Sequence, residues 1–220
     1  MRMRFTARRK LGRPATATGV GARQRIVNAA RNEFIEMGYA AATIQTIATR
    51  ADLTRPAVSY HFSGKRELYL EAIQHPAAAV IDAAAAAARR SETLSTQLSN
   101  FFSAAIVAGE TDGCTARLVL TAMRESVVNT GLAPEGKDVL HSVRTFVASA
   151  VYDAIDRSEL SITTDVLIVA ESMVAVFCGI GVYAGSLGSA ENLATIVDSI
   201  ELLLRPDHAW YTPANDSSDV

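Results

Sequence analysis

Apolar residues recur every three or four positions along most of the chain, which is the period of an amphipathic helix. A first helix is predicted from residue 23 by four residues that share one helical face: Ile26, Ala30, Phe34 and Met37. Gly38 follows this face directly and is a typical C-terminal stop. The chain therefore opens its ordered part with a helix of about four turns.

Three shorter helical segments follow, and their starts are marked by capping residues. Thr43 is a good N-cap for the second helix, and Thr54 for the third, which carries Pro56 in its first turn. The third helix ends near residues 61–62, and Lys65 opens a fourth that ends near residues 75–76. A second and third helix joined by a turn of about four residues predict a helix-turn-helix.

The remaining pattern is also helical. Breaks rich in Gly, Asn, Ser and Thr divide it into segments near residues 77–88, 92–108, 114–128, 137–157, 164–185 and 189–204. Strict alternation of apolar and polar residues is missing, so no strand is predicted. The fold class is all-α, with a three-helix head followed by a larger helical body.

Charge divides the chain at the same place. Its net charge is −2, but residues 1–75 hold thirteen Lys and Arg against five acids, a net charge of +8. The remaining 145 residues carry a net charge of −10. Such asymmetry favours an N-terminus that faces nucleic acid and a body with another task.

Composition excludes several other classes. With 49% hydrophobic and 20% charged residues the chain is globular rather than disordered. Cys114 and Cys178 are too few for a disulfide framework or a four-ligand zinc site. The four histidines are scattered and no nucleophile, base and acid come together, so we expect neither an enzyme nor a cofactor or metal.

Two segments of the body have more than one interpretation. Residues 166–187 are long and apolar enough to span a bilayer, but Glu171 and several small residues favour a buried helix of a soluble oligomer. The Gly179-Ile180-Gly181 run lies in a helical pattern without a preceding strand, so it is more typical of close helix contact than of a dinucleotide site. The N-terminus lacks an apolar signal region, and we expect a cytoplasmic protein.

Residues 23–73 carry a set of landmarks in register. These are Phe34 with Gly38-Tyr39, Thr43-Ile44 with Ile47-Ala48, Ala51-Asp52-Leu53-Thr54, Val58-Ser59-Tyr60-His61-Phe62 and Lys65-Arg66-Glu67-Leu68. In this pattern the segment resembles the DNA-binding domain of the tetracycline-repressor (TetR) family of bacterial regulators. Many family members have a Tyr at the position of Ser59, and here the Tyr stands one residue later.

A short recognition helix presents its N-terminal residues to base edges in the major groove. Arg55 stands there and can read guanine with two hydrogen bonds, and Pro56 and Ala57 are small enough for contact with a thymine methyl. The remaining predicted DNA contacts are polar groups that can reach a base edge or phosphates: Thr43, Thr54, Ser59, Tyr60, His61 and Lys65. Thr43 has the alternative role of a simple cap, and His61 that of a surface histidine.

A basic arm precedes the head. Arg8, Arg9, Lys10 and Arg13 lie in residues 1–22, which hold no acid. The run Lys10-Leu11-Gly12-Arg13-Pro14 partly resembles an AT-hook core, with Leu11 in place of its first Arg. We expect phosphate or minor-groove binding from this arm, and a solvated leader is the alternative.

The TetR resemblance implies that the body dimerises and holds a small-molecule pocket. The predicted dimer interface has two stripes: Leu167, Ala170, Val174, Phe177 and Gly181 on one helix, and Leu193, Ile196, Val197, Ile200 and Leu204 on the next. Polar residues inside apolar helices are the candidates for the effector pocket: Asn100, Arg124, His141, Arg144, Tyr152 and Glu171. Each of these has the alternative of a surface or structural role.

The sequence thus predicts four parts: an arm over residues 1–22, a helix-turn-helix head over 23–75, a ligand-binding and dimerisation body over 76–205, and a disordered tail over 206–220. The expected protein is a homodimeric repressor that binds a palindromic operator, responds to a small-molecule effector and does not enter a membrane. A ligand-independent architectural DNA-binding protein is one alternative, and an enzyme that uses the body's pocket is a second.

Overall fold

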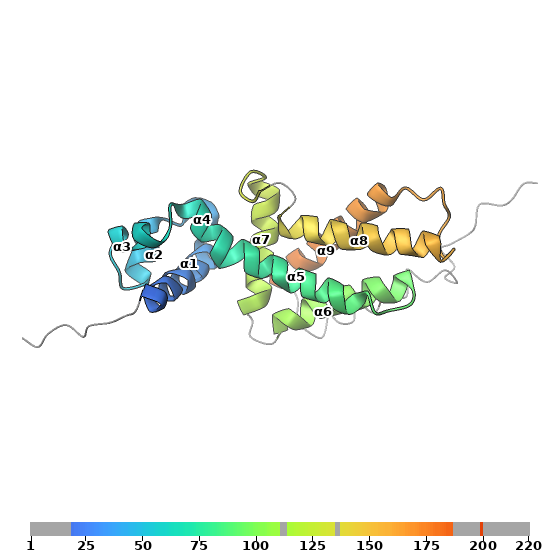
Figure 1. The fold of residues 1–220 in the computed structure, drawn as a ribbon, viewed down its shortest axis with the longest axis horizontal. Coiled ribbons are helices and arrows are strands. Elements are labelled where there is room, and N and C mark those ends of the chain that lie inside the picture. Colours follow the sequence, from blue (N-terminus) through green and yellow to red (C-terminus); the bar gives the residue numbers. More distant parts are fainter. Residues whose placement is uncertain (1–18, 111–113, 135–136, 187–198, 200–220) are drawn as a thin grey trace, which may run out of the picture.

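The structure, a computed structural model, describes residues 19–110, 114–134, 137–186 and 199, and this part of the chain is helical without a strand. The elements are α1 (Gly19–Ala41), α2 (Ile44–Arg50), α3 (Arg55–His61), α4 (Lys65–Tyr69), the π-helical turn η1 (Leu70–Gln74), α5 (His75–Ala88), α6 (Leu94–Glu110), α7 (Cys114–Val128), α8 (Val139–Asp156) and α9 (Val166–Ser186). Figure 1 shows a head of α1 to α4 at one end and a body of α5 to α9 at the other. The all-α prediction is confirmed.

The head forms as its capping residues predict. Thr43 accepts a hydrogen bond from the Thr46 N–H at 3.0 Å, and Thr46 Oγ1 accepts one from the Thr43 N–H at 3.1 Å, so the two form a capping box at α2. Thr54 caps α3 by accepting from the Ala57 N–H. Gly38 leaves the helical region with φ 77° and ψ 170°, and it breaks the straight part of α1 where the sequence predicts a stop.

Head and body share one continuous helix, which corrects a prediction. We expected the helix from Lys65 to end near residues 75–76, but α4, η1 and α5 follow one another with helical backbone at each join. The carbonyl of Ala72, four residues before Pro76, receives a hydrogen bond of 3.2 Å from Arg31 Nε on α1. A side chain of the head thus donates to the backbone turn in which Pro76 has no N–H of its own.

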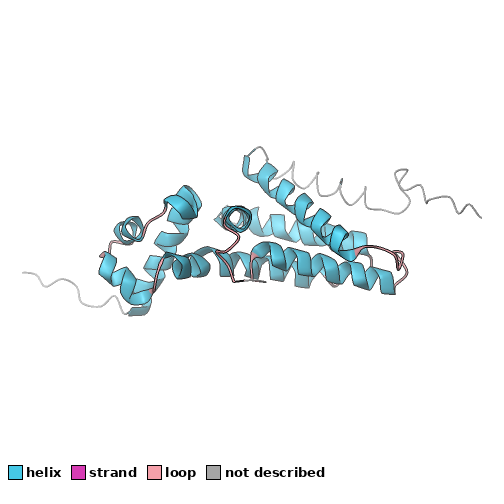
Figure 2. Cartoon of the chain, turned by 90° about the horizontal axis from the view of Figure 1, so that it is seen from above, coloured by secondary structure: helices cyan, strands magenta, loops and turns pink. Residues whose placement is uncertain are grey.

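The body packs α5 to α9 around an aromatic centre. Phe101 of α6 stacks on Phe146 of α8 with ring centroids 4.5 Å apart, and Phe177 of α9 lies 5.8 Å from Phe101. The view in Figure 2, turned by 90°, shows α9 crossing the body obliquely. The predicted helices over 92–108, 114–128, 137–157 and 164–185 all appear within a few residues of their expected ends, whereas 189–204 lies outside the described residues.

One face of α9 differs from the prediction. Three residues of the stripe that we assigned to a dimer interface, Ala170, Val174 and Phe177, are buried in the core of the single chain. Gly181 lies against α7, where a Cβ would come within 2.9 Å of Met123. Leu167 is the exposed member of this stripe. The stripe fills the protomer's own core because α7 and α8 already cover it.

The stretch Val166–Tyr183 of α9 is the single segment in the described ranges that is long and apolar enough to cross a membrane by length and composition alone. Because the core helix of a soluble protein passes the same test, this property is weak support for a membrane span. The structure explains part of its apolar character by burial against α8.

Candidate nucleic-acid interface

Helix α3 holds its polar residues outward by burying one apolar face. Val58 and the C-capping Phe62 are buried in the head, which fixes the rotation of this seven-residue helix. Arg55, Ser59 and Tyr60 are exposed on its other side, and Tyr60 is 86% exposed. The ring and hydroxyl of Tyr60 are therefore both accessible to a partner. The helix therefore presents donors and an aromatic ring to a partner.

The smaller predicted contacts lie around these three. Pro56 is exposed and Ala57 is half-buried at the start of α3. His61 is half-buried at the end of α3, and its ring meets that of Tyr60 edge-on with centroids 5.2 Å apart. Thr43 and Thr54 are exposed, and both use their hydroxyl groups as helix caps.

Lys65 is tied to the head itself. Its Nζ donates a hydrogen bond of 3.1 Å to the carbonyl of Ala40 and lies 4.5 Å from the centre of the Tyr39 ring. Burial lowers the pKa of this ammonium group, against an opposing attraction from Glu125. The sequence predicts a phosphate contact here, whereas the structure gives the side chain an internal partner. A contact from its backbone N–H stays a prediction.

Most other cations of the head have intramolecular partners. Arg50 donates two hydrogen bonds, of 2.8 and 2.6 Å, to the Glu36 carboxylate, and this pairing lowers the pKa of Glu36. Arg23 pairs with Glu71 of η1. Arg55, by contrast, forms no ion pair with any residue that the structure describes. Among the head's arginines it is the one placed on the exposed face of α3. The arm residues Arg8, Arg9, Lys10 and Arg13 lie outside the described residues.

A second set of contacts, which sequence reasoning missed, joins head to body. The Tyr39 N–H donates a hydrogen bond of 3.1 Å to Glu125 Oε1 on α7, and Arg66 Nε of α4 donates one of 2.8 Å to the carbonyl of Leu132. Glu125 is 5% exposed, and its other oxygen accepts from Asn129 at 2.6 Å. Sequence pattern marked Gly38 but gave no sign of the acid 87 residues later that faces it.

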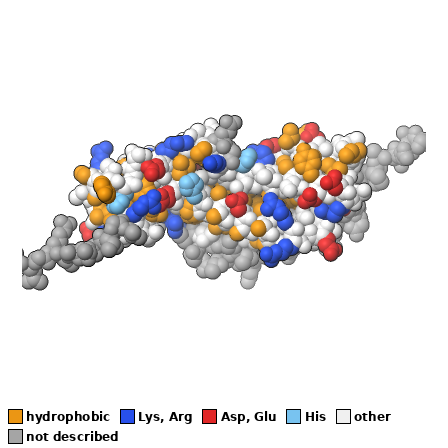
Figure 3. All heavy atoms as spheres, viewed as in Figure 1, with side chains coloured by type: hydrophobic (Ala, Val, Ile, Leu, Met, Phe, Trp, Pro, Cys, Tyr) orange, Lys and Arg blue, Asp and Glu red, His pale blue; other side chains and the backbone are white. Residues whose placement is uncertain are grey.

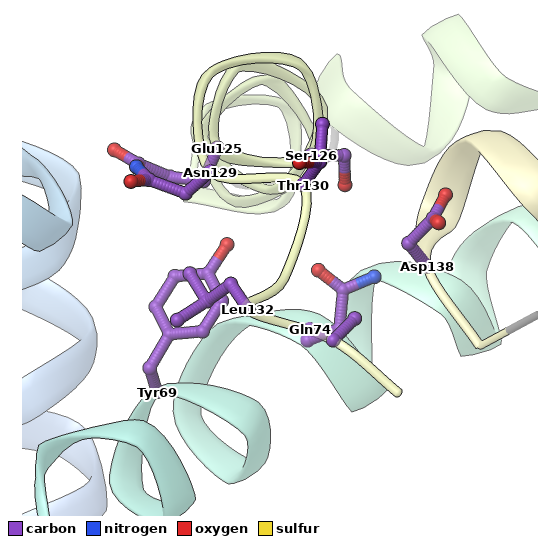
Figure 4. A pocket seen from close by; sticks show the side chains of 9 residues that line it. Tyr69, Gln74, Glu125, Ser126, Asn129, Thr130, Leu132 and Asp138 are labelled. Carbon is purple, nitrogen blue, oxygen red and sulfur yellow. The ribbon is translucent and has the colours of Figure 1, made fainter. Parts of the chain in front are cut away.

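A small polar cavity lies beside this joint (Figure 4). It is lined by Tyr69 and Gln74 from the head-to-body helix and by Glu125, Asn129 and Asp138 from the body. Figure 4 shows the Tyr69 hydroxyl pointing toward the side of α7 that carries Glu125 and Asn129. Burial raises the pKa of that hydroxyl, with a smaller contribution from Glu125. The cavity has a volume of about 10 Å³, which is room for a single water molecule rather than for an organic ligand.

The structure does not bring the six candidates for an effector pocket together. Arg124 lines a cavity of about 380 Å³ between α1, α7 and α9, while His141 lines one of about 230 Å³ between α5 and α8. The other four line none of the cavities seen among the described residues: Asn100, Arg144, Tyr152 and Glu171.

All four have evident structural or surface positions. Arg144 and Glu171 form an ion pair between α8 and α9, which raises the pKa of the arginine and lowers that of the acid. Asn100 donates a hydrogen bond of 2.8 Å to Ser91. Tyr152 is 58% exposed on the surface of α8. A shared effector pocket made of all six residues is therefore not what the chain forms.

Charged side chains of both signs lie on the visible face of the head and of the body (Figure 3). Figure 3 shows that most acidic side chains on the visible face of the body lie toward the end farthest from the head. The described part of the chain places no group of three or more His, Cys, Asp or Glu residues that could hold a metal ion.

A compact head whose third helix projects polar residues beyond a buried anchor defines a helix-turn-helix DNA-binding protein. Comparison with known proteins agrees. The family described as "Bacterial regulatory proteins, tetR family" matches residues 26–72. The regulator SrpR of Pseudomonas putida is 41% identical over 70 residues, which are 30% of this chain and 32% of SrpR. The regulator TtgW, also from Pseudomonas putida, shows the same identity over the same length, which is 52% of TtgW.

These curated relatives match only over a third to a half of their own length, and the match falls on DNA-binding regulators. The fold comparison extends over the body. FadR from Bacillus subtilis, in complex with stearoyl-CoA, has a TM-score of 0.66 at 16% identity, over 82% of this chain and 96% of that one. SmeT of Stenotrophomonas maltophilia has a TM-score of 0.63 at 18% identity, over 88% and 94%. Residues 26–72 of this chain are therefore similar to the DNA-binding part of the tetR family of bacterial regulatory proteins, and the chain as a whole has the fold of these two solved structures.

Proposed function

We propose that this protein is a homodimeric cytoplasmic repressor that binds a palindromic operator through α3 and is released by a small-molecule effector. The observation that carries the proposal is the exposure of Arg55, Ser59 and Tyr60 above the buried Val58. Three polar groups on one side of a rigid helix are what base and phosphate recognition needs. The proposed parts are those of the sequence, arm 1–22, head 23–75, body 76–205 and tail 206–220, with α1 beginning at Gly19 inside the arm and one helix running through the boundary at residue 75.

Arg55 is the residue to which we assign base reading. Its guanidinium is free of carboxylate partners in the described part of the chain, so it retains its donors for guanine O6 and N7. Ser59 stands one helical turn further on and reaches a base edge or a phosphate. Tyr60 and His61 are assigned to phosphates at the end of the helix.

A second copy of the chain is the partner that we assign to the exposed side of α9. Ile168, Ser172, Ala175 and Gly179 are exposed at successive helical turns, and the apolar window around them is only 28% buried within one chain. Small side chains on such a face let two helices approach closely, and a two-fold dimer matches a palindromic site. This face replaces the buried stripe of the sequence prediction. The second predicted stripe, from Leu193 to Leu204, lies outside the described residues.

Two fold neighbours support a response to small molecules. FadR of Bacillus subtilis is seen in complex with stearoyl-CoA, and SmeT is described as the repressor of a multidrug efflux pump. Among the described residues, the cavities of about 380 and 230 Å³ lie where the body meets the head and in the body. An effector that binds one head position better than another shifts the spacing of the two heads and so lowers operator affinity.

The test is selection of bound sequences from a random double-stranded DNA library by the full chain. We expect enrichment of a palindrome, and its affinity in the Arg55→Ala protein to fall by about 1–3 kcal/mol while affinity for random DNA is retained. Arg90→Ala, which removes an exposed arginine at the end of α5 in the body, is the matched control. Equal losses on both DNAs would remove the base-reading role. Diffuse A·T-rich enrichment would favour the architectural alternative, and no enrichment would overturn the proposal.

A further inference from the structure

The groove of about 380 Å³ between head and body has the size of a small-molecule site. Its walls come from three helices: Ile35 from α1, Leu120 and Thr121 from α7, and Val182 from α9. Gly181 lets α9 lie close to α7, because a Cβ there would come within 3.0 Å of Leu120 Cδ2 and within 2.9 Å of Met123 Cε. This close contact brings Val182, 67% exposed, to the edge of the groove. The groove therefore has an apolar surface built from both parts of the molecule.

Charge along the groove is uneven in a way that selects a ligand. Arg117 and Arg124 both line it, two helical turns apart on the same side of α7. Arg124 is already neutralised, because its Nη2 lies 2.9 Å from Glu125 Oε1. Arg117 is exposed and pairs with no carboxylate in the described residues, and the nearby Glu36 is held by Arg50. Within the described residues, the groove thus offers one guanidinium, Arg117, that attracts Glu36 without an ion pair to it and lies beside apolar side chains.

We propose that this groove binds an amphipathic organic monoanion, with its carboxylate on Arg117 and its apolar chain along Ile35, Leu120 and Val182. A guanidinium donates two parallel hydrogen bonds to a carboxylate, and this pairing fixes the position of the ligand's carboxylate. The apolar chain then covers side chains that are otherwise open to water. A single anionic group suffices because the second arginine is occupied by Glu125.

The position of the groove gives such a ligand a means of acting on the head. Ile35 belongs to the head, whereas Arg117 and Val182 belong to the body, so the ligand's affinity depends on their relative placement. Arg124, at the far end of the groove, contacts the same carboxylate that holds the Tyr39 N–H. This inference rests on the proposed ligand response and assigns it a site and a ligand class.

The experiment is a binding titration of the full chain with dodecanoate in the absence of DNA. Dodecanol serves as the neutral probe of equal length, and acetate as the carboxylate without the apolar chain. We expect saturable binding of dodecanoate, and a dissociation constant about 10-fold to 100-fold higher in Arg117→Gln, the loss that one charged hydrogen-bonded contact gives. Arg90→Gln, on the body surface away from the groove, leaves the constant unchanged. Acetate alone is expected not to saturate.

Val182 provides a second pair of variants. Val182→Asp places a carboxylate at the edge of the groove and Val182→Asn a neutral group of the same size, so dodecanoate binds more weakly to the aspartate variant. Equal binding by wild type and Arg117→Gln, or by Val182→Asp and Val182→Asn, would overturn the site. Because no DNA is present, such a result leaves operator binding and release by another effector untouched. Loss of operator selection, in turn, would overturn the proposed function without changing dodecanoate binding.

Discussion

The backbone N–H of Tyr39 donates a hydrogen bond of 3.1 Å to Glu125 Oε1, across 86 positions of sequence. Tyr39 follows the Gly38 break in the head, and Glu125 is a buried acid on the body helix α7. A carboxylate that accepts a backbone N–H in a half-buried place gives a strong, directional contact. This bond links the two parts of the molecule, together with the Arg66–Leu132 hydrogen bond and the helix that they share.

Glu125→Leu is expected to lower the free energy of unfolding by about 1–3 kcal/mol, because the Tyr39 N–H loses its acceptor in a buried place. Glu125→Gln keeps one oxygen that can accept, so its loss is smaller. Urea denaturation followed by circular dichroism measures the difference. Glu92→Leu, at an exposed position in the α5–α6 connection, is the control.

Amide hydrogen exchange gives this prediction a local readout. The Tyr39 amide should exchange faster in Glu125→Leu than in wild type, since its protection depends on this bond. The Val58 amide, buried within α3, should exchange faster only to the extent that the global free energy of unfolding falls. An unchanged ratio of the two rates would show that Glu125 does not hold the head.

Gly38 is expected to be hard to replace. Its φ of 77° with ψ of 170° is a conformation that residues with a Cβ avoid, and a Cβ would also come within 2.6 Å of Arg124 Nη2. Gly38→Ala should therefore cost about 1–3 kcal/mol in urea denaturation. Adding Arg124→Ala removes the close contact but not the backbone strain, so most of the loss should persist.

Gly131→Ala is the matched control, because Gly131 has no positive φ and open space where the Cβ would stand. It should change stability by less than about 0.5 kcal/mol. Full rescue of Gly38→Ala by Arg124→Ala would assign the cost to contact with the arginine alone and contradict the backbone argument.

The head could be predicted almost entirely from sequence, because its signals are local. Thr43 and Thr54 are caps, and Gly38 is a stop, for reasons that act within four residues. Burial of the α9 stripe could not be predicted in the same way. An apolar stripe states only that it must be covered, and Val174 and Phe177 are covered by helices of the same chain rather than by a second copy.

The same difference between local signals and long-range packing explains which residues of the site could be predicted. Exposure of Arg55 and Tyr60 follows from the rotation of a short helix around Val58, which periodicity sets. The internal role of Lys65 does not, since it depends on where the carbonyl of Ala40 and the ring of Tyr39 stand in space. The effector candidates failed to converge because a polar residue inside an apolar helix is as easily explained by an ion pair such as Arg144 with Glu171.

Pro76 and Arg31 are expected to be energetically coupled. Proline has no N–H for the carbonyl of Ala72, and Arg31 Nε supplies the donor at 3.2 Å. Arg31→Met alone leaves this buried carbonyl without that donor and should cost about 1–3 kcal/mol. In a Pro76→Ala background the new N–H can bond to Ala72, so Arg31→Met should cost less there.

A double-mutant cycle in urea measures the coupling, which we expect to be about 0.5–2 kcal/mol. Arg89→Met at the end of α5 is the control for loss of an arginine, and it should be additive with Pro76→Ala. Additivity of Arg31→Met with Pro76→Ala would show that the arginine does not stand in for the missing N–H.

The last prediction concerns alkaline pH and the hydroxyl of Tyr69. Tyr69 is 1% exposed, and its hydroxyl makes no hydrogen bond to a described protein group. Burial, with a smaller contribution from Glu125, raises the pKa of this hydroxyl above 10.0. The folded protein therefore keeps its proton at a pH where the unfolded chain loses it. The contribution to stability is full below pH 10 and is lost as pH rises from there through the folded pKa. Each unit above pH 10 should cost up to about 1.4 kcal/mol.

Tyr69→Phe removes the titrating group and keeps the ring against Phe34, whose centroid lies 5.3 Å away. Its free energy of unfolding at pH 7 should match or slightly exceed that of wild type, because no protein hydrogen bond is lost. Between pH 9 and 11 it should fall less steeply than in wild type, and Tyr152→Phe, at an exposed tyrosine, should follow the wild-type curve. Parallel curves for wild type and Tyr69→Phe would place the alkaline loss on another group and show that the buried hydroxyl does not resist ionisation.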